Sequence, residues 1–106
     1  MIKIAIHRNL ANLITGFTVD GHANTAPRGQ DIVCAAVSAL TQTAVLGLEC
    51  YLKRSFTFDM ASGKLKVILE DAPDQLTGAI LETMLLGLLE IEKINPQFVR
   101  ILEHRR

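Results

Sequence analysis

The sequence predicts an α+β domain: a two-layer sandwich in which an antiparallel-rich sheet carries two helices on one face. Two observations carry this prediction. Short segments with alternating apolar residues occur in pairs, and a single long apolar segment of helical character follows each pair. The resulting order is β-β-α-β-β-α-β, with one more strand at the end, and such an order favours helices packed on one face of a sheet. With 106 residues, the chain forms one domain over residues 1–106, with a single modest core.

The first half of the chain supplies two strands, a loop and a helix. Residues 2–6 (IKIAI) and 14–21 (ITGFTVDG) alternate as half-buried strands do, and they form a loose hairpin. Residues 22–30 (HANTAPRGQ) have no periodicity and are rich in turn-forming residues, which predicts a loop. A loop of that length in a small protein is often functional. A helix follows, with Asp31 as its N-cap, and it runs to about residue 54.

The second half repeats the pattern and adds the last strand. Residues 56–70 predict a hairpin, because apolar residues alternate on both sides of the turn at 61–63. A second helix begins within residues 71–75 and ends near Asn95, since the proline that follows cannot continue it. Residues 97–104 (QFVRILEH) form the final strand.

Both predicted helices are more apolar than a two-layer monomer requires. A helix that covers one face of a sheet should carry a broad polar back. Leu86 instead falls on the polar stripe of the second helix, and Ala44, Val45 and Leu48 are candidates for exposure on the first. Scattered exposed leucines are normal in monomers. Pairing of helices between two copies of the chain would bury the excess, so we expect a homodimer.

Composition excludes several classes of function. The formal net charge is zero, which argues against direct binding to nucleic acid or to an anionic membrane. The most apolar stretch, residues 79–89, is too short to span a bilayer, and no signal peptide is visible. Two cysteines do not make a disulfide framework. We therefore expect a cytoplasmic protein with reduced thiols.

Cys34 is the residue whose position carries chemical information. Cys34, Ser38 and Gln42 are spaced i, i+4, i+8, so they share one helical face that is otherwise polar. Cys50 falls about 160° around the helix, among apolar neighbours, at 3.6 residues per turn. A sulfur in the first helical turn lies near unpaired N–H groups and the positive end of the dipole, which favour the reactive thiolate.

His22 is the candidate partner of Cys34. It follows a predicted strand, and strand ends and helix starts meet at one edge of a two-layer fold. A cysteine and a histidine are the minimum for nucleophilic catalysis by a thiol. The spacing alone leaves open that both residues merely pack, as in a non-catalytic dimeric protein. No spacing typical of metal ligands and no phosphate-binding loop is present, so we expect neither a metal nor a cofactor.

The segment DGHANTAPRGQDIVCAAVSALTQT resembles the signature of the ribosomal-processing cysteine protease family, Prp. In that family a Gly-His pair ends the second strand and an Asp-Ile-Val-Cys-Ala-Ala-Val-Ser run opens the first helix. Gly21, His22 and the run from Asp31 to Ser38 match both elements. The resemblance implies a cytoplasmic homodimer that removes a short N-terminal extension from a large-subunit ribosomal protein, with no cofactor. The cut follows a short apolar and aromatic stretch of that extension.

The same resemblance assigns roles to residues. Cys34 matches the nucleophile and His22 the base. Asp31 matches an acidic position that could orient His22 or cap the helix, and Ser38 matches a supporting position one turn beyond Cys34. The loop that covers the site and moves when substrate binds corresponds to Gly21, Ala23, Asn24, Pro27 and Gly29. The competing hypotheses are a non-catalytic ribosome-associated or ribosome-assembly dimer, and a thiol hydrolase unrelated to ribosomes.

Overall fold

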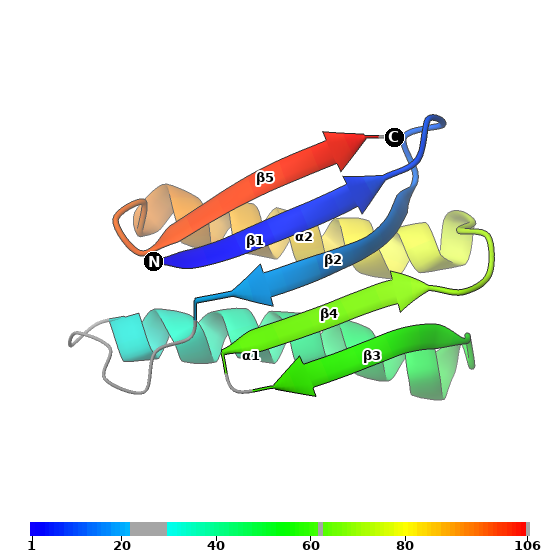
Figure 1. Cartoon of the computed structure of the whole chain (residues 1–106), viewed down its shortest axis with the longest axis horizontal. Helices are drawn as coiled ribbons and strands as arrows, with labels where there is room; N and C mark the ends of the chain where they lie inside the picture. The colour runs from blue at the N-terminus through cyan, green and yellow to red at the C-terminus, as the bar shows by residue number, and fades with distance from the viewer. Residues whose placement is uncertain (22–29, 62, 106) are drawn as a thin grey trace.

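The computed structural model confirms the predicted order of elements. It describes residues 1–21, 30–61 and 63–105. Strands β1 (Ile2–Arg8) and β2 (Ile14–Asp20) precede helix α1 (Gln30–Leu46), which continues into a π-helical turn, η1 (Gly47–Tyr51). Strands β3 (Phe56–Ala61) and β4 (Lys64–Leu69), helix α2 (Gln75–Ile94) and strand β5 (Val99–Arg105) complete the chain. Both helices lie behind one face of the sheet, and no described helix or strand covers the other face (Figure 1).

The sheet is antiparallel-rich, as the sequence predicts. Its strand order is β3-β4-β2-β1-β5. The pairs β1·β2, β2·β4 and β3·β4 are antiparallel, whereas β1 and β5 are parallel. The parallel pair requires the chain to cross the sheet, and α2 makes that crossing between β4 and β5. The two halves of the chain therefore interlock in one sheet.

The core forms where the alternating strand residues meet the apolar sides of the helices. Ile4, Ile6 and Phe17 point from the sheet toward the helices and are almost fully buried. Leu48, from η1, and Leu81, from α2, meet them and are 0% exposed. By length and composition alone the helical segment Asp31–Tyr51 could cross a membrane. In this fold it is a core helix, because its buried side chains join the hydrophobic cluster of the sheet.

The boundaries of the first helix differ from the prediction. The helix begins at Gln30, so Asp31 lies within the first turn instead of capping it. The α-helical part ends at Leu46, not near residue 54, because η1 takes over at Gly47. In η1 the Leu52 N–H donates to the Gly47 carbonyl oxygen at 2.9 Å, a five-residue interval that widens the turn. Side chains beyond Gly47 therefore leave the positions that a period of 3.6 residues predicts.

The second helix agrees with its sequence signals. Asp74 is the N-cap, and its carboxylate accepts hydrogen bonds from the Leu76 and Thr77 N–H groups at 3.0 and 3.1 Å. The Thr77 hydroxyl accepts from the Asp74 N–H, which completes a capping box. The helix ends at Ile94 with Asn95 as its C-cap. The last strand starts two residues later than predicted, at Val99, because residues 96–98 form a turn.

The prediction of excess apolar surface on the helices is only partly correct. Leu86 is 66% exposed, as predicted. Ala44, Val45 and Leu48 are buried, so their predicted exposure is wrong. They lie on the side of the first helical segment that faces the sheet and α2. The exposed large apolar side chains of this segment are instead Ile32, Leu46 and Tyr51.

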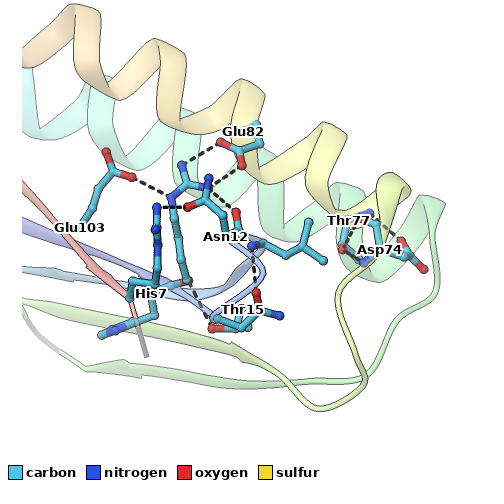
Figure 2. A network of polar contacts seen from close by, with 11 residues as sticks. His7, Asn12, Thr15, Asp74, Thr77, Glu82 and Glu103 are labelled. Carbon is cyan, nitrogen blue, oxygen red and sulfur yellow. Dashed lines mark hydrogen bonds and ion pairs between the residues drawn. The ribbon is translucent and has the colours of Figure 1, made fainter.

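A network centred on Arg8 ties the end of β1 to α2 and β5. The Arg8 guanidinium donates to both carboxylate oxygens of Glu82 at 2.7 and 3.0 Å, and to Glu103 at 2.8 Å. It also donates to the Asn12 carbonyl oxygen at 3.0 Å (Figure 2). The hydrogen bond to Glu82 raises the pKa of Arg8 above its ordinary value, so the guanidinium stays charged. Sequence reasoning did not find this network, because its members are far apart in the chain.

Candidate active site

The predicted catalytic segments meet at one end of the molecule. Strand β2 ends at Asp20, and helix α1 begins at Gln30, at the left of Figure 1. The start of β4 and the end of β3 lie at the same end. His22 follows β2 by two positions, but it lies outside the described residues, as do Ala23, Asn24, Pro27 and Gly29.

Gly21 fixes the path of the chain immediately before His22. Its φ is +104°, a backbone conformation that L side chains rarely adopt. Its N–H donates to the Gly63 carbonyl oxygen at 3.1 Å, which ties the end of β2 to the turn between β3 and β4. A Cβ atom at Gly21 would collide with the carbonyl oxygen of Met1. A glycine is therefore required here by both conformation and space.

Cys34 is the fifth residue of α1 and is 8% exposed. The helical spacing predicts Cys34 on a polar stripe, whereas its side chain is buried and belongs to the hydrophobic cluster. Its helical position still favours reactivity. Helical side chains lean toward the N-terminus of their helix, so the direction of the Cα–Cβ bond is toward the first turn and its unpaired N–H groups.

Ser38 and Gln42 continue the helical face of Cys34 and border a groove. Ser38 is half-buried and Gln42 is exposed. The groove has a volume of about 480 Å³ and lies between this helix and residues of β2, β3 and β4. Its lining residues are Val19, Ser38, Thr41, Gln42, Met60, Ala61, Gly63, Lys64 and Leu65. The stripe of Ser38 and Gln42 was visible in the sequence, but the opposite wall was not, since it comes from the β3–β4 hairpin.

The groove is apolar on its sheet side and polar on its helix side. Leu65 is buried, Val19 is half-buried and Met60 is 52% exposed, so a bound molecule would meet aliphatic surface there. The Thr41 hydroxyl donates within the helix, to the carbonyl oxygens of Val37 at 2.9 Å and Ser38 at 3.3 Å, so its proton is not directed at the groove. The groove begins one helical turn from Cys34, so an extended chain in it passes close to the thiol.

Asp31 and Cys50, at the two ends of the first helical segment, are both exposed. Asp31 is exposed in the first turn of α1, where its charge suits the positive end of the helix. Cys50 is exposed, so its predicted place on the apolar side is wrong; the π-helical turn rotates it outward. Among the described residues, no group of three His, Cys, Asp or Glu side chains is close enough to hold a metal ion.

Comparisons with known proteins indicate the class of enzyme to which this fold belongs. The chain is 31% identical over 104 residues to the ribosomal processing cysteine protease Prp of Staphylococcus aureus strain Mu50, covering 95% of this chain and 97% of that protein. A crystal structure of an essential ribosomal processing protease Prp from S. aureus, in complex with a substrate peptide, superposes with a TM-score of 0.91. It is 27% identical, and the match covers 97% of this chain and 99% of that one.

A second S. aureus Prp structure, in complex with a covalently linked product peptide, gives a TM-score of 0.86 at 27% identity, with both chains fully covered. Both neighbours are proteases in complex with a peptide, which supports protease activity for this fold. The fold and these relatives define a cysteine protease. The sequence pattern of the cysteine protease Prp family matches residues 1–100, and the chain belongs to that family.

Proposed function

We propose that this protease removes the N-terminal extension of a large-subunit ribosomal protein precursor, with Cys34 as nucleophile and His22 as base. The observation that carries the proposal is the position of Cys34. It lies near the start of α1, one turn from a groove that can take an extended peptide. The relatives that match over the whole chain are ribosomal processing proteases.

The groove accounts for a preference for apolar residues next to the scissile bond. Val19, Met60 and Leu65 provide an aliphatic wall, and burial of a large apolar side chain against such surface contributes roughly 1.5–3 kcal/mol. Gln42 and Lys64 lie among the lining residues and can bind backbone carbonyl oxygens of the peptide. The groove thus suits a short apolar and aromatic stretch in extended conformation.

The reaction proceeds through a thioester. His22 takes the proton of the Cys34 thiol, and the thiolate attacks the scissile carbonyl carbon to form a tetrahedral oxyanion. N–H groups in the first turn of α1, which have no partner within the helix, are suited to stabilise that oxyanion. His22 then protonates the leaving amine as the C–N bond breaks. Water, activated by the same imidazole, hydrolyses the thioester and regenerates the thiol.

Burial of Cys34 gives the loop before α1 a role in access. At 8% exposure the thiol presents little surface to solvent, so a peptide carbonyl must displace atoms that cover it. The segment 22–30 joins base and nucleophile in the chain and is the proposed gate. Asp31 and Ser38 support the site, Asp31 by its negative charge at the helix start and Ser38 by the polar surface that it adds beside the thiol. Peptide binding would then complete the dyad, so that other proteins of the cell would not be cleaved.

The proposed test is cleavage of the purified precursor, followed by mass spectrometry of the products. Wild-type protein should release one N-terminal peptide, and Cys34→Ala and His22→Ala should each reduce cleavage to the uncatalysed background. Cys50→Ala is the matched control and should cleave normally, because Cys50 is exposed and distant along the helix. Full cleavage by Cys34→Ala would overturn the assignment of the nucleophile. Equal cleavage of unrelated peptides in a panel would instead indicate a general thiol hydrolase.

The proposal includes a homodimer in the cytoplasm, where ribosomal precursors are made. An apolar groove of about 550 Å³ runs between α1 and α2, lined by residues that include Leu40, Tyr51 and Ile80. Tyr51 is 84% exposed and Leu86 is 66% exposed near this surface on the two helical segments. A second copy that packs its helices against this surface would remove these side chains from water.

A further inference from the structure

The uncovered face of the sheet has a charge distribution that the overall composition hides. Side chains alternate along each strand, so the face opposite the helices can be identified from the pairing register. Its Lys and Arg residues are Lys3, Lys64, Lys66 and Arg100, and all four are exposed. Of the chain's 11 carboxylate residues, two lie on this face, Asp20 and Asp59. The remaining carboxylates lie on the helices, the loops and the sheet edge, so the zero net charge is the sum of two unlike faces.

Three of these cations form a row across four strands. Lys64 pairs in register with Asp20, Asp20 with Lys3, and Lys3 with Arg100. Adjacent strands are about 4.8 Å apart, so the row extends about 14 Å. Within the described part of the chain, none of these residues takes part in an ion pair, whereas Arg8 and Arg54 do. The row therefore holds three cations and one carboxylate, Asp20, which lies directly across the strands from both Lys3 and Lys64, so its net charge is positive but partly offset.

A hollow lies beside this row, in the middle of the face. It has a volume of about 400 Å³ and is lined by His7, Thr18, Asp20, Lys64, Lys66 and Ile68. Gly16, which is buried, pairs in register with two of the lining residues, Ile68 and His7. Lys64 and Lys66 are two positions apart on β4, about 7 Å, a separation comparable with that of successive phosphates in an extended single strand.

The face also offers planar surface for bases. The rings of His7 and His104 are stacked, with centroids 5.7 Å apart and an interplanar angle of 23°. They lie side by side on β1 and β5, and His7 also lines the hollow. Histidine is among the side chains on which unpaired bases stack. A polyanionic peptide would use the cations but would have no use for the paired rings.

We propose that the open face of the sheet binds single-stranded RNA, with phosphates on Lys3, Lys64, Lys66 and Arg100 and a base against the His7–His104 pair. Open sheets that carry cations and planar rings bind single strands, because such a surface can follow the backbone while bases lie flat on it. The face lies opposite the helices, and Lys64 borders both the face and the groove, so bound RNA and bound peptide would compete for this side chain. The inference goes beyond peptide hydrolysis and does not depend on which precursor is cleaved.

The magnitude follows from the number of phosphates that are neutralised. For single strands, the slope of log affinity against log salt is about −0.7 for each phosphate, so four contacts give about −2.8. Between 50 and 200 mM salt the affinity should then fall about 50-fold. Removal of two cations should reduce the slope to about −1.4 and the fall to about sevenfold.

The experiment measures fluorescence anisotropy of a labelled 12-nucleotide mixed-sequence RNA, titrated with the whole protein at several salt concentrations. The test variant is Lys3→Gln/Lys66→Gln, and the control is Lys53→Gln/Lys93→Gln, which changes the net charge equally on the helical side. The slope of log affinity against log salt should fall to about −1.4 in the test variant, which should still cleave peptide at the wild-type rate. The control should bind RNA as wild type does.

Equal loss in both variants would overturn the inference, because general charge and not this face would then be responsible. Binding that a 12-residue polyglutamate displaces as efficiently as unlabelled RNA would assign the face to an acidic protein partner instead. Absence of RNA binding at 50 mM salt, with peptide cleavage intact, would refute the RNA site and leave the proposed protease function untouched.

Discussion

Arg8 is the side chain whose removal should have the largest effect at the end of the fold remote from Cys34. Its side chain is 11% exposed and makes three hydrogen bonds to carboxylates, two to Glu82 and one to Glu103 (Figure 2). Arg8→Met keeps much of the aliphatic volume and removes the charge. The two carboxylates then face each other without a shared cation.

The cost can be worked from these contacts. A hydrogen bond to a charged group contributes about 1.5–3 kcal/mol when it is well shielded. Glu82 and Glu103 are each 44% exposed and can be rehydrated, so three bonds together contribute less than their sum. We expect a loss of about 2 kcal/mol in the free energy of unfolding. For a chain of 106 residues, that corresponds to a decrease in Tm of about 9 °C.

The assay is thermal unfolding at pH 7, with Lys3→Met as the matched control on the same strand. Lys3 is exposed and forms no ion pair within the described residues, so its replacement should shift Tm by less than about 2 °C. A double-mutant cycle with Glu82→Gln should give a coupling of at least about 1 kcal/mol. A wild-type Tm in Arg8→Met, or a coupling near zero, would refute the view that this network holds α2 and β5 to the sheet.

Three further predictions concern assembly, substrate and pH. Leu86→Glu should shift the protein from dimer to monomer in sedimentation, whereas Leu10→Glu, in the exposed β1–β2 turn, should not; a wild-type monomer at micromolar concentration would contradict the dimer. Met60→Glu should raise KM for an apolar peptide by roughly 10-fold with a smaller change in kcat, and an unchanged KM would exclude the groove. The hydrogen bond from Arg54 lowers the pKa of Asp74. The Asp74 carboxylate therefore stabilises the fold above its unfolded pKa of about 4, and this stabilisation is lost as pH falls further. The difference in Tm between wild type and Asp74→Asn should then disappear on acidification. A difference in Tm that stays constant with pH would contradict this.

Local sequence signals determined the elements and their order. Alternation in IKIAI and in the β3–β4 hairpin depends only on neighbours in the chain, so each strand could be recognised without its partners. The second helix was equally legible, because its start within residues 71–75 and its stop at Asn95 are local chemistry, although only the structure identifies Asp74 as the cap. The motif that contains Cys34 and Ser38 was also fully present in the sequence, and with it the family.

Burial and register were decided only by the tertiary structure. Helical periodicity could not reveal that Cys34 is covered, since the covering atoms come from elsewhere in the chain. It placed Cys50 on the wrong side because the π-helical turn at Gly47 breaks the period. The wall of the groove that includes Met60 depends on how the β3–β4 hairpin packs beside α1.

The same limit applies to charge. The sequence gives only a net value of zero, and from it we expected no contact with nucleic acid. The sheet order β3-β4-β2-β1-β5 brings Lys3, Lys64 and Arg100 together from three distant segments, while most carboxylates lie on the other side of the molecule. Pairing between strands is a long-range interaction that depends on the whole fold. Composition and spacing therefore identify the residues of a surface, but only the packed sheet decides which of them share a face.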